Sequence, residues 1–131
     1  KRQGLVLHIR PVTTEGKRGS LVDKWYRQQV KEKASSLIEK WEGKMGVSVE
    51  NFSVRKMKTR WGSCTPASRT IRLNLELAKK SPECLEYVIV HELAHLLEPS
   101  HNSRFVALMD QFLPEWKFCR AELKKTRNII F

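Results

Sequence analysis

The segment from His91 to His95 reads HELAH and lies inside an almost wholly apolar stretch. It limits the folds and functions open to this chain more than any other feature of the sequence. Residues four apart share one face of a helix, so the two histidines can direct their imidazoles at one metal ion. Ser81-Pro82-Glu83 is typical of a helix start, with an N-cap hydroxyl, a proline at the first helical position and an acid in the first turn. The pattern predicts a buried helix that ends at Glu98-Pro99 and carries a polar cluster into the core.

A zinc ion would satisfy these buried polar side chains. His101 completes the pattern HExxHxxxxxH, and we expect it to be the third ligand because Pro99 breaks the helix and lets the chain turn back. Glu98, one turn after His95, is the alternative third ligand. Zinc with three protein ligands keeps a position for water and lowers the pKa of that water to about 7. On the helix, Glu92 is offset from the face that carries His91 and His95. We therefore expect it to take the proton of the water as general base.

Length and cysteine content indicate the class of protein. At 131 residues, we expect a single domain over residues 1–131, large enough to form a core without disulfides. The three cysteines, Cys64, Cys84 and Cys119, are widely spaced and odd in number, which favours a reducing compartment and a cytoplasmic location. No run approaches the ~18 consecutive apolar residues of a membrane span, so we expect no membrane partner. The chain begins at Lys1 rather than methionine, and residues 1–19 are interpreted as the remnant of a larger N-terminal sheet.

The net charge of +11, from 25 basic and 14 acidic residues, indicates either an anionic partner or simply a well-solvated surface. Nucleic acid, a nucleotide and an acidic peptide all fit the first interpretation. If residues 55–61 form a strand, Lys56, Lys58 and Arg60 project from one side, beside the indole of Trp61. That arrangement suits phosphate and base contacts, although packing of Trp61 into the core fits equally well.

The remaining pattern predicts an α+β domain with helices on one side of a small sheet. Apolar residues at spacings of three and four predict a long amphipathic helix from Leu21 to about Met45, ending near Gly43 or Gly46. The other expected elements are a strand at 5–12, a polar loop at 13–20, one or two strands within 47–59, a turn at 62–66, a strand at 70–74, a helix at 105–112 stopped by Pro114, and a last helix at 116–126.

Three blocks together resemble the YgjP-like metallopeptidase domain family: KTRWGSC at 58–64, IRLN at 71–74, and HELAH with His101 and Phe105. The resemblance covers roughly residues 20 to 127, and the joint occurrence of the blocks is specific. More distantly, the chain is similar to the SprT and WLM peptidases, which act on DNA-linked proteins. The resemblance implies a zincin-like small mixed sheet with a long N-terminal helix, an HExxH active-site helix and C-terminal helices.

The resemblance also implies that His91, His95 and His101 bind zinc and that Glu92 is the catalytic acid/base. It further implies that the strand from Ile71 to Asn74 is the sheet edge along which an extended substrate pairs. The candidate substrate-binding residues are therefore Lys58, Arg60, Trp61, Arg72 and Asn74.

A zinc metallopeptidase is the leading interpretation, with two alternatives. Some YgjP-like proteins are described as nucleoside triphosphate pyrophosphatases acting on UTP, and the basic residues of segment 55–61 would then bind the triphosphate. Phosphoanhydride hydrolases usually recruit magnesium through carboxylates, however, and the sequence has no acidic cluster of that kind. The third interpretation is a DNA-associated zinc-binding module, against which Glu92 counts because a structural zinc needs no such carboxylate.

Several roles stay open at the level of sequence. Tyr87 and Arg60 are candidate donors to the oxyanion of a tetrahedral intermediate, although Tyr87 also fits the core. Cys64 is either a thiolate near the metal or a buried structural cysteine. Glu98 and Asp110 are candidates to orient the histidines.

Overall fold

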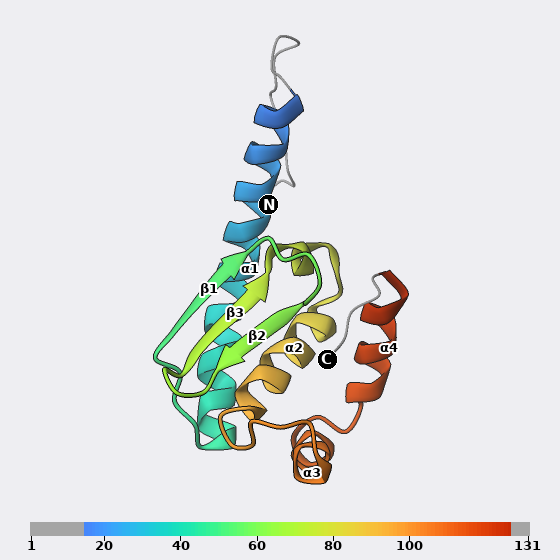
Figure 1. The fold of residues 1–131 in the computed structure, drawn as a ribbon. Helices are drawn as coiled ribbons and strands as arrows, with labels where there is room; N and C mark the ends of the chain where they lie inside the picture. The colour runs from blue at the N-terminus through green and yellow to red at the C-terminus, as the bar shows by residue number, and fades with distance from the viewer. Residues whose placement is uncertain (1–14, 127–131) are drawn as a thin grey trace.

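Helix α2 (Pro82–Ala94) lies at the centre of the molecule, between a small sheet and the C-terminal helices (Figure 1). The structure, a computed structural model, describes residues 15–126. Helices α1 (Glu15–Met45) and α2 cover one face of the sheet, while α3 (Ser103–Phe112) and α4 (Trp116–Thr126) pack against α2. The expected α+β architecture with helices on one side of the sheet is confirmed. No helix within the described range is long and apolar enough to cross a membrane.

Helix α1 buries one face, and the buried positions recur at helical spacing. Val30, Ala34, Ile38, Trp41 and Met45 are all buried in the core. The helix ends at Gly46, whose φ of +68° is the left-handed conformation that glycine adopts at a helix end without strain. The amide of Gly46 donates to the carbonyl oxygen of Glu42 at 2.9 Å.

The start of α1 differs from the prediction, because the helix begins at Glu15 and the expected loop at 13–20 is mostly helical. Extending a helix that is already nucleated costs little per residue, so two glycines do not stop it. The strand expected at 5–12 lies outside the described residues.

The sheet has three strands in the order β1-β3-β2. Strand β1 (Asn51–Arg55) runs parallel to the central strand β3 (Thr70–Asn74), and β2 (Gly62–Thr65) runs antiparallel to β3. Ile71 and Leu73 of β3 are fully buried and face the helices. The expected strand at 70–74 is confirmed, and the 47–59 segment contains one strand.

Two local predictions were wrong. Residues 62–65 form β2 rather than a turn, because pairing with β3 supplies the backbone hydrogen bonds that local glycine and serine preferences do not predict. Residues 56–61 form a loop rather than a strand, so Lys56, Lys58 and Arg60 are not aligned on one strand face. Lys56 pairs with Asp23 of α1 at 3.6 Å.

Helix α2 starts as predicted. Ser81 caps it, with Oγ accepting from the amide of Cys84 at 3.4 Å, and Pro82 occupies the first turn. The regular helix ends at Ala94, earlier than the predicted stop at Glu98-Pro99, because the amides of residues 95–97 bond three residues back and tighten the last turn. The two C-terminal helices lie where the sequence predicts them.

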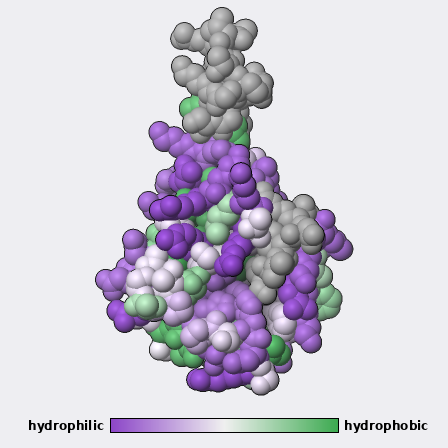
Figure 2. Space-filling view, in the orientation of Figure 1, coloured by the Kyte–Doolittle hydropathy of each residue, from purple (hydrophilic) through white to green (hydrophobic). Residues whose placement is uncertain are grey.

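The surface seen in Figure 2 is mostly hydrophilic, with hydrophobic residues in small separate areas. Large hydrophobic side chains exposed among the described residues are Leu21, Val106 and Phe118. The apolar core instead surrounds α2, whose Tyr87, Val88, Ile89, Val90 and Leu93 are all completely buried. The polar residues of the HELAH segment are therefore carried by a helix whose apolar side chains are buried in the core.

Candidate metal centre and catalytic pocket

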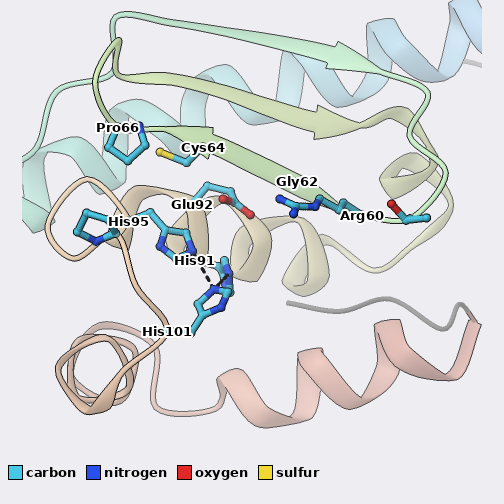
Figure 3. A pocket seen from close by; sticks show the side chains of 10 residues that line it. Arg60, Gly62, Cys64, Pro66, His91, Glu92, His95 and His101 are labelled. Atoms are coloured by element: carbon cyan, nitrogen blue, oxygen red, sulfur yellow. Dashed lines mark hydrogen bonds between the residues drawn. The ribbon is translucent and has the colours of Figure 1, made fainter.

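Three imidazoles converge at the end of α2. Nε2 of His101 lies 3.2 Å from Nε2 of His91 and 2.9 Å from Nε2 of His95 (Figure 3). One nitrogen from each ring lies within 4.8 Å of the other two. Nitrogens bound to one zinc ion at 2.0–2.1 Å in tetrahedral geometry are separated by about 3.3 Å, so the three rings have the spacing of a metal site.

The backbone carbonyl of Glu98 selects the tautomer of His95. Its Nδ1 lies 3.2 Å from the carbonyl oxygen of Glu98. A carbonyl oxygen can only accept, so Nδ1 carries the proton and Nε2 keeps its lone pair for a metal. Phe105 of α3 stacks on the His95 ring, with centroids 4.6 Å apart and an interplanar angle of 24°, and also contacts the rings of His91 and His101. The ring orientations are therefore set by both packing and hydrogen bonding.

The protonation of the histidines suits metal binding. Burial, followed by the charges of His95 and His101, lowers the pKa of His91 to about 3. Burial is also the main cause that lowers the pKa of both His95 and His101. Neutral imidazoles offer the lone pairs that a cation requires.

The two acidic candidates near the triad have other partners. The Glu98 carboxylate pairs with Arg104 at 3.6 Å and accepts from the amide of Ser100 at 3.2 Å. It does not belong to the triad cluster, so the structure brings His101 rather than Glu98 to the candidate metal position. Asp110 accepts from the indole N–H of Trp116 at 2.8 Å. Glu98 was one of the two candidates to orient the histidines, and its backbone carbonyl, not its carboxylate, contacts His95.

Glu92 lies on α2 beside the triad and is 3% exposed. Burial raises the pKa of Glu92 to about 8, and the positive charge of Arg60 partly opposes this effect. A divalent cation at the triad would lower that pKa further, because it favours the ionised form.

A pocket of about 580 Å³ opens over the triad, within the size range of small-molecule and peptide sites. Its walls come from the loop before β2, from β2 itself, from α2 and from the turn that leads to His101 (Figure 3). The lining residues are Thr59, Arg60, Gly62, Cys64, Pro66, His91, Glu92, His95, Pro99 and His101.

The predicted substrate-binding residues separate into two groups. Arg60 lines the pocket, whereas Lys58 and Arg72 are not among its lining residues. Trp61 is 1% exposed, so its indole belongs to the core and is not an exposed stacking surface.

Asn74 is completely buried and fixes the loop before β2. Its Nδ2 donates to the carbonyl oxygens of Met57 at 3.0 Å and Arg60 at 2.8 Å. Asn74 therefore acts on the position of Arg60 instead of facing the pocket.

The predicted substrate edge was also wrong. Strand β3 is central, with β1 and β2 on its two sides, so its backbone has no free edge. Within the sheet that residues 15–126 form, β1 and β2 are the two edge strands, and Gly62 and Cys64 of β2 line the pocket. The order of the strands depends on tertiary pairing, which the sequence of an isolated strand does not encode.

The structure also defines the surroundings of Cys64 and Tyr87, the two other candidates near the metal position. Burial, and then the nearby Glu92, raises the pKa of the Cys64 thiol to about 11, and its sulfur does not belong to the cluster of His91, His95 and His101. Tyr87 is completely buried and packs edge-on against the ring of His91, with centroids 5.8 Å apart. Sequence reasoning missed Gly62, Pro66 and Pro99 as pocket residues, although the RWGSC block contains the first.

A small mixed sheet above a helix that carries HExxH and a third histidine defines a zincin-like metallopeptidase domain. The YgjP-like metallopeptidase domain family matches residues 1–126, and the chain belongs to this family. The resemblance noted from the sequence blocks is thereby confirmed.

Solved structures agree on the fold. The metallopeptidase zymogen abylysin of Pyrococcus abyssi has a TM-score of 0.65 and 22% identity, covering 72% of this chain and 95% of that one. The metallopeptidase zymogen jannalysin of Methanocaldococcus jannaschii has a TM-score of 0.52 and 24% identity, covering 77% of this chain and 95% of that one. These identities establish likeness of fold alone. A search among curated proteins finds no match.

Proposed function

We propose that this domain is a zinc-dependent peptidase in which His91, His95 and His101 hold the metal and Glu92 is the general base. The observation that carries the proposal is the convergence of three neutral imidazoles beside a buried carboxylate at one pocket wall. Bound zinc would supply a Lewis acid that polarises a carbonyl group and acidifies a water molecule.

The residues of the chain supply the proton transfer and the orientation. Glu92 is buried with a raised pKa, and a group that titrates near the working pH accepts and returns a proton most effectively. Strand β2 has no partner strand on its pocket side among the described residues, so an extended peptide can pair with its backbone. Such pairing would bring a peptide bond over the triad.

A nucleoside triphosphate pyrophosphatase is the second candidate, and the observation in its favour is the guanidinium of Arg60 at the pocket wall. Within residues 15–126, however, Glu92 is the single carboxylate that lines the pocket. Magnesium-dependent phosphoanhydride chemistry normally uses more than one carboxylate, which favours the peptidase. A DNA-associated binding module remains the third candidate and predicts no hydrolysis at all.

The test compares wild-type protein with Glu92→Gln for zinc content and for hydrolysis of peptides, nucleoside triphosphates and a DNA-linked protein. We expect about one zinc per chain in both proteins. Because an amide cannot take the proton, peptide cleavage should fall about 100-fold or more in the variant. Glu39→Gln, an exposed glutamate of α1, is the matched control and should behave as wild type. Near-full peptide cleavage by Glu92→Gln would refute the mechanism, and cleavage of triphosphates alone would refute the peptidase.

A further inference from the structure

Among the described residues that line the pocket, Arg60 is the single cationic side chain apart from the histidines. Figure 3 shows its guanidinium extending from the start of β2 toward the side chain of Glu92. Within residues 15–126, no carboxylate lies within salt-bridge distance of it, whereas Lys56, Arg69 and Arg104 each have an acidic partner. A cation that faces a pocket without a protein partner is available to an anionic ligand.

The backbone that carries Arg60 is held in place on both sides. Its carbonyl oxygen accepts from Nδ2 of Asn74 at 2.8 Å, and the carbonyl oxygen of Trp61 accepts from the amide of Asn74 at 2.9 Å. The neighbouring indole of Trp61 is buried in the core. Only the side chain of Arg60 has to be ordered when a ligand binds, which reduces the entropic cost of recognition.

Arg60 and Glu92 both line the pocket, and the guanidinium lies on the side of Glu92 that is away from Cys64 and Pro66 (Figure 3). Away from Arg60 the described lining residues Cys64 and Pro66 of the β2 side carry no charged side chain (Figure 3). The pocket is therefore electrostatically asymmetric along β2.

The direction of β2 relates this asymmetry to the direction of a substrate. Strand β2 runs from Gly62, next to Arg60, toward Thr65, next to Pro66. Antiparallel pairing is the more stable arrangement per residue, and a peptide paired in this way runs in the opposite direction. Its residues after the scissile bond then lie at the Arg60 end, and those before it lie at the neutral end.

We propose that Arg60 selects substrates with a carboxylate on the C-terminal side of the scissile bond. The carboxylate belongs either to an Asp or Glu side chain or to the free C-terminus of a short peptide, and the chemistry of recognition is the same for both. The proposal rests on the proposed peptidase function and deepens it by naming a substrate class. Arg60 acts here as a specificity-determining residue.

The experiment measures kcat/KM of the zinc-loaded protein on matched peptides that carry Glu, Gln or Lys either after or before the cleaved bond. A second series compares free and amidated C-termini, which distinguishes the two sources of the carboxylate. The variants are Arg60→Gln and Arg60→Glu, with Arg55→Gln as control because Arg55 is exposed on β1 and does not line the pocket. Binding of the same peptides to Glu92→Gln protein supplies a readout that does not depend on turnover.

We expect wild type to prefer the anionic peptide over its neutral counterpart by about tenfold or more, since charge-assisted hydrogen bonds contribute at this level. Arg60→Gln should remove the preference, Arg60→Glu should invert it in favour of Lys, and Arg55→Gln should leave it unchanged. Binding affinities should show the same preferences when the Arg60 substitutions are compared in the Glu92→Gln background.

Three results would overturn the inference. An equal fall in kcat for every peptide in Arg60→Gln would place the guanidinium on the transition state rather than on a substrate carboxylate. A preference for acidic residues before the cleaved bond would refute the orientation, and no preference in either assay would refute the site. If wild type cleaves no peptide but Arg60-dependent binding of anionic peptides persists, the peptidase proposal fails while the carboxylate site stands.

Discussion

The carboxylate of Glu92 occupies space beside Gly62 that a side chain at position 62 would need. A β-carbon built on Gly62 would stand 3.1 Å from Oε2 of Glu92, 2.8 Å from Cγ1 of Val88 and 3.2 Å from the carbonyl oxygen of Arg72. The absence of a side chain at position 62 lets β2 approach α2 this closely. The position of the proposed base therefore depends on the glycine of edge strand β2.

Gly62→Ala should retain zinc and lower kcat by about ten- to 100-fold, because a displacement of the base near 1 Å is costly. Overpacking should also reduce the free energy of unfolding by about 1–3 kcal/mol. The double variant Gly62→Ala/Val88→Ala separates the two effects, since it removes the contact with Val88 and leaves the contact with Glu92. The kcat of the double variant should stay low. A return to the kcat of Val88→Ala alone would show that the β-carbon at position 62 does not displace Glu92.

His91→Ala and His95→Ala should abolish zinc binding, and His101→Ala should weaken it, because three nitrogens converge on one position. Metal content after dialysis and the zinc dissociation constant are the measurements. Glu98→Gln is the matched control and should keep zinc, since its carboxylate pairs with Arg104. Unchanged zinc in His101→Ala together with loss of zinc in Glu98→Gln would transfer the third-ligand role to Glu98.

Asn74→Ala should lower the free energy of unfolding by about 2–3 kcal/mol, because the carbonyl oxygens of Met57 and Arg60 lose a buried donor. Urea unfolding measures this change. The variant should keep zinc, since Asn74 does not line the pocket, and should weaken any Arg60-dependent preference among substrates. A change below about 0.5 kcal/mol would mean that water replaces these hydrogen bonds at no cost.

Glu86 links α2 to α1, accepting from the indole N–H of Trp41 at 2.7 Å and from Lys40 at 2.9 Å. Burial by itself raises the pKa of Glu86, but these hydrogen bonds and the charges of Lys40 and Lys44 outweigh it, so the pKa lies below its ordinary value of 4.5. A depressed folded-state pKa means that the stabilisation is present above the unfolded-state value and is lost as pH falls through the folded-state value.

Glu86→Gln should therefore lower the free energy of unfolding at pH 7 by about 0.5–1 kcal/mol, a modest change because the group is partly solvated. The difference from wild type should shrink in urea titrations as the pH falls from the ordinary glutamate value through the lowered folded-state pKa, because both states then bind the proton. Glu39→Gln, on the exposed face of α1, should change stability little at either pH. A difference between wild type and Glu86→Gln that grows on acidification would contradict the assigned cause.

Local patterns predicted the elements whose stability depends on their own residues. The cap at Ser81, the proline at position 82 and the apolar run that follows define α2 before any contact is known. Pro114 separates α3 from α4 in the same way, and the buried spacing of α1 is visible as a helical period. The spacing of the HELAH segment with His101 likewise predicted which side chains converge, because ligand geometry on a helix follows from its period.

The arrangement of the sheet could not be predicted in this way. Residues 62–65 have the composition of a turn and become a strand because β3 supplies their hydrogen bonds. The same pairing makes β2 an edge strand, so the pocket wall differs from the predicted one. The backbone carbonyl of Glu98 that orients His95 is equally invisible in a sequence, since every residue has a carbonyl.

The sequence by itself determined where the four long helices lie, except for some of their ends, and which side chains are the candidate metal ligands, because helical period, caps and ligand chemistry are properties of nearby residues. The tertiary structure alone decided which strand is exposed, that Trp61 and Asn74 are buried while Arg60 faces the pocket, and how Gly62 positions Glu92. Each of these features depends on contacts between segments distant in the chain, and no local pattern encodes them.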